Sequence, residues 1–98
     1  MKRTSVKYEE GLRKDLADAK EAAAYLNAAL EDGSQEVFLM ALRDVAEARG
    51  IAKVARESLL NRENIYRILS AQGNPQFTSL KALLDTLGLK LAIAVSQT

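Results

Sequence analysis

Residues 51–70, IAKVARESLLNRENIYRILS, decide the fold because they describe two short helices separated by a break. Apolar residues recur at helical spacing over 51–58, and after the break at 59–60 the pattern resumes with Asn61 as the N-cap of a second helix. Ala55 is small where two crossing helices approach each other most closely. The apolar side chains that would fix the crossing angle are Val54, Leu60, Ile65 and Ile68. This spacing predicts a helix-turn-helix in which the first helix braces the second.

The polar face of the second predicted helix carries side chains suited to a DNA groove. If its apolar residues face the core, a rotation of about 100° per residue turns Arg67 and Ser70 outward and leaves Asn64 and Tyr66 on the flanks. Arginine can bond guanine through two acceptors, asparagine can pair with adenine, and the N–H groups at a helix start suit a phosphate. The candidate DNA contacts are Lys53, Arg56, Asn61, Arg62, Asn64, Tyr66, Arg67 and Ser70.

An alternative interpretation of the same stretch is a helical hairpin whose polar face is merely solvated. Glu63 is a separate case: we expect it to pair with Arg67 at i, i+4, an interaction worth only about 0.2–0.5 kcal/mol, and not to read a base.

Charge is distributed unevenly along the chain, although the net charge is only +1 at pH 7. Residues 21–50 hold two Lys/Arg against six Asp/Glu, a net charge of −4, whereas residues 51–72 hold four against two, a net charge of +2. A basic element therefore follows an acidic one, and a basic element is the electrostatic footprint expected of a DNA-binding face.

Further helices are predicted on both sides of this motif. A short helix is expected over 8–16, weakened by Gly11, and a longer one after Asp18, whose pairing with Glu21 forms an acidic variant of the capping box. The apolar face of that longer helix comprises Ala22, Leu26, Ala29 and Leu30. Gly33 ends it, and Ser34 caps the next helix, which runs to Gly50.

The segment after the motif is expected to be a loop followed by one more helix. The loop is AQGNPQF, over 71–77, and Thr78 or Ser79 then caps a helix that Gly88 closes. The apolar stripe of this last helix comprises Leu80, Leu83, Leu84 and Leu87.

The C-terminal tail, 89–96, alternates apolar and other residues with a period of two, which predicts a β-strand. A lone strand either packs on its own helices or pairs with the same strand of a second copy, and the open row of backbone groups favours antiparallel pairing in a homodimer. The residues of that predicted dimer contact are Leu89, Leu91, Ile93 and Val95. Such a dimer would present two recognition helices to half-sites roughly 34 Å apart, which predicts a palindromic operator.

The whole chain is therefore expected to be one all-α domain of about five helices, 1–98, with a short C-terminal strand. It divides into an N-terminal helical extension (1–33), a helical core (34–88) with the helix-turn-helix at 51–70, and the strand (89–96). No linker is long enough to separate a second domain.

Composition argues against enzymatic chemistry. The chain has no cysteine and no histidine, so thiolate metal sites, disulfides and the commonest general base are missing, and we expect no catalytic residue, no metal and no cofactor. The polar start MKRTSVKYEE lacks the apolar core of a signal peptide, and no apolar run approaches the roughly 20 residues that cross a bilayer. We expect a cytoplasmic protein with no membrane partner.

Residues 22–57 and 60–91 resemble a known family in order and spacing, with YLNAALEDG (25–33) and RENIYRILS (62–70) as the most specific pieces. The family is that of the probable addiction-module antidote proteins, HigA-like antitoxins with a Cro/phage-repressor-type helix-turn-helix. The resemblance implies an antitoxin that neutralises a RelE/HigB-like toxin, binds operator DNA and represses its own operon as a dimer. It also implies a supporting helix at Ile51–Ser58, a recognition helix at Asn61–Ser70 and a further helix at Ser79–Leu87.

This sequence departs from the family pattern at two places. The turn of the motif usually holds glycine where this chain has Leu59, and a leucine in a left-handed conformation costs roughly 1 kcal/mol or more. Phage repressors often begin the supporting helix with Ser-Gln, whereas Ala52-Lys53 stands here, so Lys53 would have to make the phosphate contact.

The toxin-binding surface is expected in the region through Glu36, because Glu31, Asp32 and Glu36 could face a basic partner. A solvated helix end is the alternative for these residues. Two further functions stay open: a stand-alone phage-type repressor, and a protein-interaction adaptor that does not read DNA.

Overall fold

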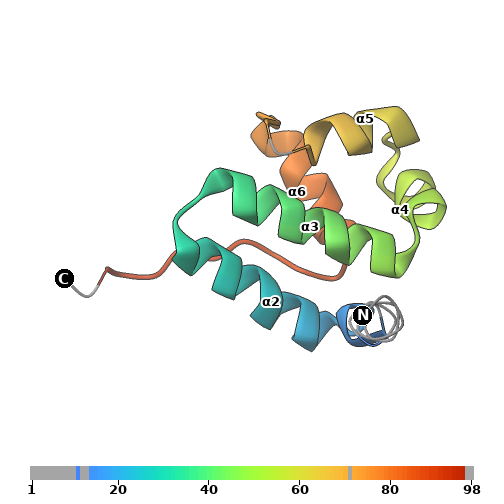
Figure 1. Cartoon of the computed structure of the whole chain (residues 1–98). Coiled ribbons are helices and arrows are strands. Elements are labelled where there is room, and N and C mark those ends of the chain that lie inside the picture. Colours follow the sequence, from blue (N-terminus) through green and yellow to red (C-terminus); the bar gives the residue numbers. More distant parts are fainter. Residues whose placement is uncertain (1–10, 12–13, 71, 97–98) are drawn as a thin grey trace, which may run out of the picture.

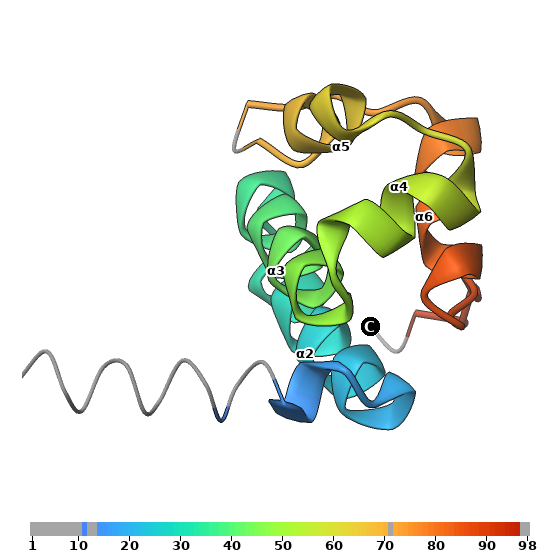
Figure 2. The same cartoon turned by 90° about the vertical axis from the view of Figure 1, so that its right-hand side faces the viewer.

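The computed structural model describes residues 11, 14–70 and 72–96, and these residues are all-α, as predicted. The helices are α2 (Ala19–Asp32), α3 (Gln35–Arg49), α4 (Ile51–Ser58), α5 (Arg62–Ile68) and α6 (Phe77–Thr86). Helices α2 and α3 form an antiparallel pair, while α4 packs against α3, α5 and α6. Figures 1 and 2 show α2 and α5 on opposite sides of α3. Of the short helix predicted over 8–16, Gly11 and residues 14–16 are helical, and the rest lies outside the described residues.

Local signals in the sequence set the boundary between α2 and α3. Gly33 adopts φ 82°, a left-handed conformation that ends α2, and its N–H donates to the carbonyl of Leu30. The Ser34 hydroxyl then accepts a hydrogen bond from the N–H of Val37 at 3.2 Å and caps α3. Both predicted boundaries are confirmed. At the start of α2, Asp18 occupies the N-cap position but its side chain makes no cap hydrogen bond, so the predicted capping box is not formed.

One apolar cluster joins the described helices. Its largest fully buried side chains are Leu39, Leu42, Val45, Val54, Ile65, Leu69, Leu83 and Leu87. The predicted inward faces are confirmed for Ala22, Leu26 and Ala29 of α2, but the prediction for Leu30 was wrong, because this side chain is half exposed. Ala29 already occupies the inward direction, and the next residue is rotated by about 100° away from it.

The end of α3 is joined to the end of α6 by a side-chain hydrogen bond. Arg49 is half-buried, and its Nη2 donates to the carbonyl of Leu87 at 3.1 Å. This bond satisfies one of the carbonyls left open at the C-terminal end of α6.

Helix α6 begins earlier than predicted. Gln76 is its N-cap residue, without a side-chain cap bond, and Phe77 lies in the first turn with an exposed side chain. The predicted caps Thr78 and Ser79 are therefore inside the helix. Gly88 ends it at φ 77°, as predicted.

The C-terminal tail is not a strand. Residues 89–96 form no regular element and pair with no other strand among the described residues, so the predicted strand is absent from the single chain. A strand needs the backbone of a neighbour to satisfy its N–H and C=O groups, and the helices have already satisfied theirs. The tail instead runs along the helices and then away from them, as its red-brown trace in Figure 1 shows.

Candidate nucleic-acid interface

Helices α4 and α5 are joined by residues 59–61 and cross steeply. Figure 1 views α4 nearly along its axis and α5 from the side, and Figure 2 shows the reverse. Val54 of α4 and Ile65 of α5 are fully buried, while Leu60 and Ile68 are half-buried against the same core. The four side chains predicted to fix the crossing angle are therefore all at least half-buried in one core.

Leu59 forms the turn at the end of α4. Its backbone is left-handed, with φ 64° and ψ 17°, and its side chain is 90 % exposed. The next amide, that of Leu60, donates to the Ser58 hydroxyl at 3.3 Å, which holds the chain as it leaves the turn. The expectation that a leucine occupies a left-handed position here is confirmed.

Asn61 fixes the start of α5. Its side-chain Oδ1 accepts a hydrogen bond from the N–H of Asn64 at 2.7 Å, which confirms its predicted role as N-cap. Ile65, in the middle of α5, and Leu69, its C-cap residue, are fully buried. Because cap and core fix both the position and the rotation of α5, the direction of its outer face is fixed as well.

The outer face of α5 carries Arg62, Glu63 and Arg67, all of which are exposed. The Arg67 guanidinium donates to the side-chain oxygen of Asn64, one turn earlier. No ion pair joins Glu63 to Arg67, so the alternative that these two residues form an intrahelical salt bridge is not borne out by the geometry. Arg67 and Asn64 therefore lie together as a donor-rich pair on the surface.

Tyr66 lies on the flank of α5, against α3. The guanidinium carbon of Arg43 is 5.1 Å from the centre of the Tyr66 ring, within the range of a cation–π contact. Arg43 also pairs with Glu47 one turn further along α3, at 3.5 Å. The sequence pattern did not reveal this connection, because the two helices come together only when the chain folds. Tyr66 is thus held by α3 at the edge of the candidate interface.

The remaining predicted residues lie around α5 in different ways. Lys53 and Arg56 are exposed on α4. Ser70 is half-buried, and its hydroxyl donates to the carbonyl of Arg67 at 3.0 Å, so this hydroxyl serves the end of α5.

A polar pocket of about 490 Å³ adjoins α5, and most of its residues were not predicted. Asn64 and Arg67 form one wall, and the loop before α6 forms the other. The loop contributes Gln72, Asn74 and Gln76, and the first turn of α6 contributes Ser79. It folds back closely on α5, since a Cβ at Gly73 would collide with the carbonyl oxygen of Ile68. The amide-rich stretch QGNPQ was the signal in the sequence that could have identified these side chains.

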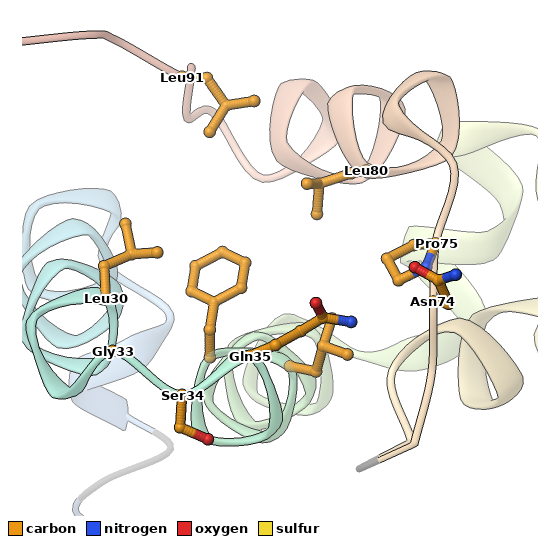
Figure 3. Close-up of a pocket in the computed structure, with 10 residues that line it drawn as sticks. Leu30, Gly33, Ser34, Gln35, Asn74, Pro75, Leu80 and Leu91 are labelled. Atoms are coloured by element: carbon orange, nitrogen blue, oxygen red, sulfur yellow. The ribbon is translucent and has the colours of Figure 1, made fainter.

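A second pocket lies on another face, where the tail leaves the body of the molecule. It has a volume of about 420 Å³ and is lined by apolar side chains from α2, α3, α6 and the tail (Figure 3). Leu30, Leu80 and Leu91 point into it, and Leu91 comes from the tail. Of the predicted dimer residues, Leu89 is half-buried, while Leu91 is partly exposed and Ile93 and Val95 are fully exposed.

Other kinds of site find no support in the part of the chain that is described. No group of three or more Asp or Glu side chains in it is arranged to hold a metal ion. None of its helices is both long enough and apolar enough to cross a membrane.

The family follows from comparison with known proteins. Residues 9–95 match the model of a family described as "Probable addiction module antidote protein". The chain belongs to this family. The antidote is also 34 % identical over 82 residues to an uncharacterized protein of Haemophilus influenzae, a match that covers 84 % of each chain. No solved structure matches it significantly. Membership of the probable addiction-module antidote family, which the sequence resemblance suggested, is therefore confirmed at the level of that family, and it implies a toxin as partner.

Proposed function

We propose that this antidote is a DNA-binding antitoxin, which neutralises a RelE/HigB-like toxin and represses its own operon as a dimer in the cytoplasm. The observation that carries the DNA-binding part of this proposal is the arrangement of α4 and α5, two steeply crossed helices joined by a left-handed turn. Asn61 caps the start of α5, and the buried side chain of Ile65 packs α5 into the core. In a Cro/phage-repressor-type helix-turn-helix, α4 is the supporting helix and α5 the recognition helix.

The chemistry of the exposed face supports this role. Arg67 offers two parallel donors for a guanine, and Asn64 next to it provides the amide that suits an adenine. The cations Lys53 and Arg56 on α4, with Arg62 at the start of α5, supply positive charge for phosphates. The amide side chains of the loop before α6 add neutral donors beside Arg67.

A dimer fits the exposed tail. Ile93 and Val95 are almost fully exposed in the single chain, and the backbone of 89–96 pairs with no strand among the described residues. Antiparallel pairing with the tail of a second copy would satisfy these backbone groups and bury both side chains.

We assign no catalytic residue.

Two alternative functions lead to different expectations. A stand-alone phage-type repressor would bind DNA in the same way but would have no toxin gene beside its own. An adaptor without DNA binding is favoured by Leu59, since a strained turn can alter the angle of α5.

Replacing Arg67 by alanine tests the proposal. The measurement is the dissociation constant, by fluorescence anisotropy, for a duplex covering the antidote's own promoter and for variants of that duplex with single base changes. We expect Arg67→Ala to lose about 1–3 kcal/mol of discrimination at one base position in each half-site. Lys20→Ala, which removes the same charge from the exposed surface of α2, should behave as the wild type. Equal discrimination by Arg67→Ala and the wild type would reject α5 as the reading helix.

A further inference from the structure

Helices α2 and α3 enclose a shallow groove of about 590 Å³ on the surface. Its floor is made of alanines from both helices, and Val37 and Met40 of α3 stand beside them. Both of these larger side chains are exposed, at 42 % and 38 %. Contiguous exposed apolar surface of this kind marks interaction sites on soluble domains. Methionine in particular adapts its shape to different partners.

The rim of the groove is acidic. Asp32 of α2 and Glu36 and Asp44 of α3 line it, and no lysine or arginine does among the residues that the structure describes. Asp44 is held in place, because the Tyr25 hydroxyl of α2 donates to its Oδ2 at 2.7 Å across the helix pair. We call this combination of an apolar floor and three carboxylates the acidic groove.

The charges of the acidic groove decide which occupant fits. A DNA backbone and an anionic membrane would both be repelled by the carboxylates. A second copy of the chain docked by the same surface would bring six carboxylates together with no cation from the described lining of either copy, which is unfavourable. The occupant that matches is a protein surface with an apolar side chain at its centre and lysine or arginine around it.

We infer that the acidic groove is the site where the antidote binds a cationic segment of its toxin. This inference rests on the proposed function, which supplies a toxin as the partner. It also reduces the set of acidic residues that the sequence suggested for toxin binding, because Asp32 and Glu36 line the groove whereas Glu31 does not. The toxin's apolar residue would lie on Met40 and Val37, and its cations would meet the rim.

The test is a binding measurement with the purified toxin encoded in the same operon, by isothermal titration calorimetry with the full-length antidote. The charge variant is Asp32→Lys with Glu36→Lys, and its matched control is Glu21→Lys with Glu31→Lys, which changes the net charge equally at exposed carboxylates of α2 outside the groove. We expect the first to weaken toxin binding by about tenfold or more and the control to stay within about threefold of the wild type.

A second variant tests the two larger apolar side chains beside the alanine floor. Val37→Ala with Met40→Ala should weaken toxin binding by about tenfold, whereas Phe77→Ala, which truncates an exposed side chain on α6, should leave it unchanged. Circular dichroism and binding to promoter DNA establish that the variants are folded, and both should match the wild type.

The outcomes separate the inference from the proposed function. If the wild-type antidote binds the toxin and both groove variants bind it equally well, the acidic groove is not the site and the inference fails alone. If the charge variant instead alters the oligomeric state in sedimentation, the groove is a contact between copies and the inference also fails. If the wild type binds no toxin from its operon, the antitoxin proposal itself is rejected.

Discussion

Leu59 is the one described residue other than glycine with a positive φ. The side chain is almost fully exposed, so it offers the core no packing in return for the backbone strain. Glycine would adopt φ 64° without a steric clash between Cβ and the following carbonyl. The packing of α4 and α5 therefore holds the turn in this conformation, and the Leu59 side chain does not stabilise it.

Replacing this leucine by glycine should stabilise the protein. We expect Leu59→Gly to raise the free energy of unfolding by about 1 kcal/mol, since relief of the left-handed strain exceeds the entropy that glycine adds to the unfolded chain. Urea denaturation measures this. Leu59→Ala keeps the Cβ and should change the stability by less than about 0.5 kcal/mol. A glycine variant less stable than the wild type would mean that the side chain makes a contact in the native state.

At the residue scale, the sequence predicted the caps of α3 and α5, but not those of α2 and α6 or the contacts between distant side chains. Ser34 and Asn61 were identified correctly because a cap depends only on the three residues that follow it. The Arg43–Tyr66 contact and the Arg49–Leu87 hydrogen bond join segments that are distant in sequence. Nothing in local spacing specifies them, since they depend on how the helices are packed.

At the scale of the helices, α2 and α3 begin in different ways. The Ser34 side chain satisfies the N–H of Val37 at the start of α3, whereas the Asp18 side chain makes no such bond at the start of α2. The similar sequence signals at these two positions therefore make different contributions to stability.

Alanine at each cap should reveal this difference. Ser34→Ala is expected to lower the free energy of unfolding by about 1 kcal/mol, within the range of about 0.5–2 kcal/mol typical of a lost N-cap. Asp18→Ala should lower it by less than about 0.5 kcal/mol, because only the favourable interaction of its charge with the helix dipole is lost. Thermal denaturation of both variants at the same pH makes the comparison. An equal loss in the two variants would contradict the assigned caps.

The bounds of a helix were predicted well where apolar residues at helical spacing were followed by a glycine that ends the helix. Helix α4 runs over the predicted Ile51–Ser58, and Gly33, Gly50 and Gly88 end elements as expected. Helix α6 begins at Phe77, two residues before the predicted start at Ser79, because the hydroxyl-based rule for caps does not recognise Gln76 as an N-cap residue. The tail was mistaken for a strand because period-two alternation also arises in a segment that no neighbouring strand accompanies.

At the scale of the whole molecule, the acidic groove and the candidate DNA interface use different helix pairs. The groove is made by α2 and α3, while the predicted DNA contacts lie on α4, on α5 and in the residues that flank α5. The tail belongs to neither surface, so dimerisation through it leaves both surfaces available to their partners. The sequence indicated this division only as a change in charge between 21–50 and 51–72.

Charge on the tail should abolish the proposed dimer. Ile93→Lys with Val95→Lys places two cations at the side chains that antiparallel pairing would bury, and we expect analytical ultracentrifugation to find a monomer. Ala92→Lys with Ala94→Lys adds the same charge on the alternate positions and should remain a dimer. Neither pair of substitutions should disturb the fold of the single chain, since all four side chains are exposed in it. A wild type that is monomeric at micromolar concentration, or a dimer that survives the first variant, would contradict pairing through the tail.

The salt dependence of binding to the antidote's own promoter tests the central claim most directly. A dimer that places α4 and α5 on two half-sites and neutralises about 6–10 phosphates should lose about 10³–10⁵ in affinity between roughly 50 and 200 mM salt, with a linear fall of log K against log salt concentration. An affinity that is independent of salt, or no binding to the promoter even at low salt, would show that these helices do not meet DNA.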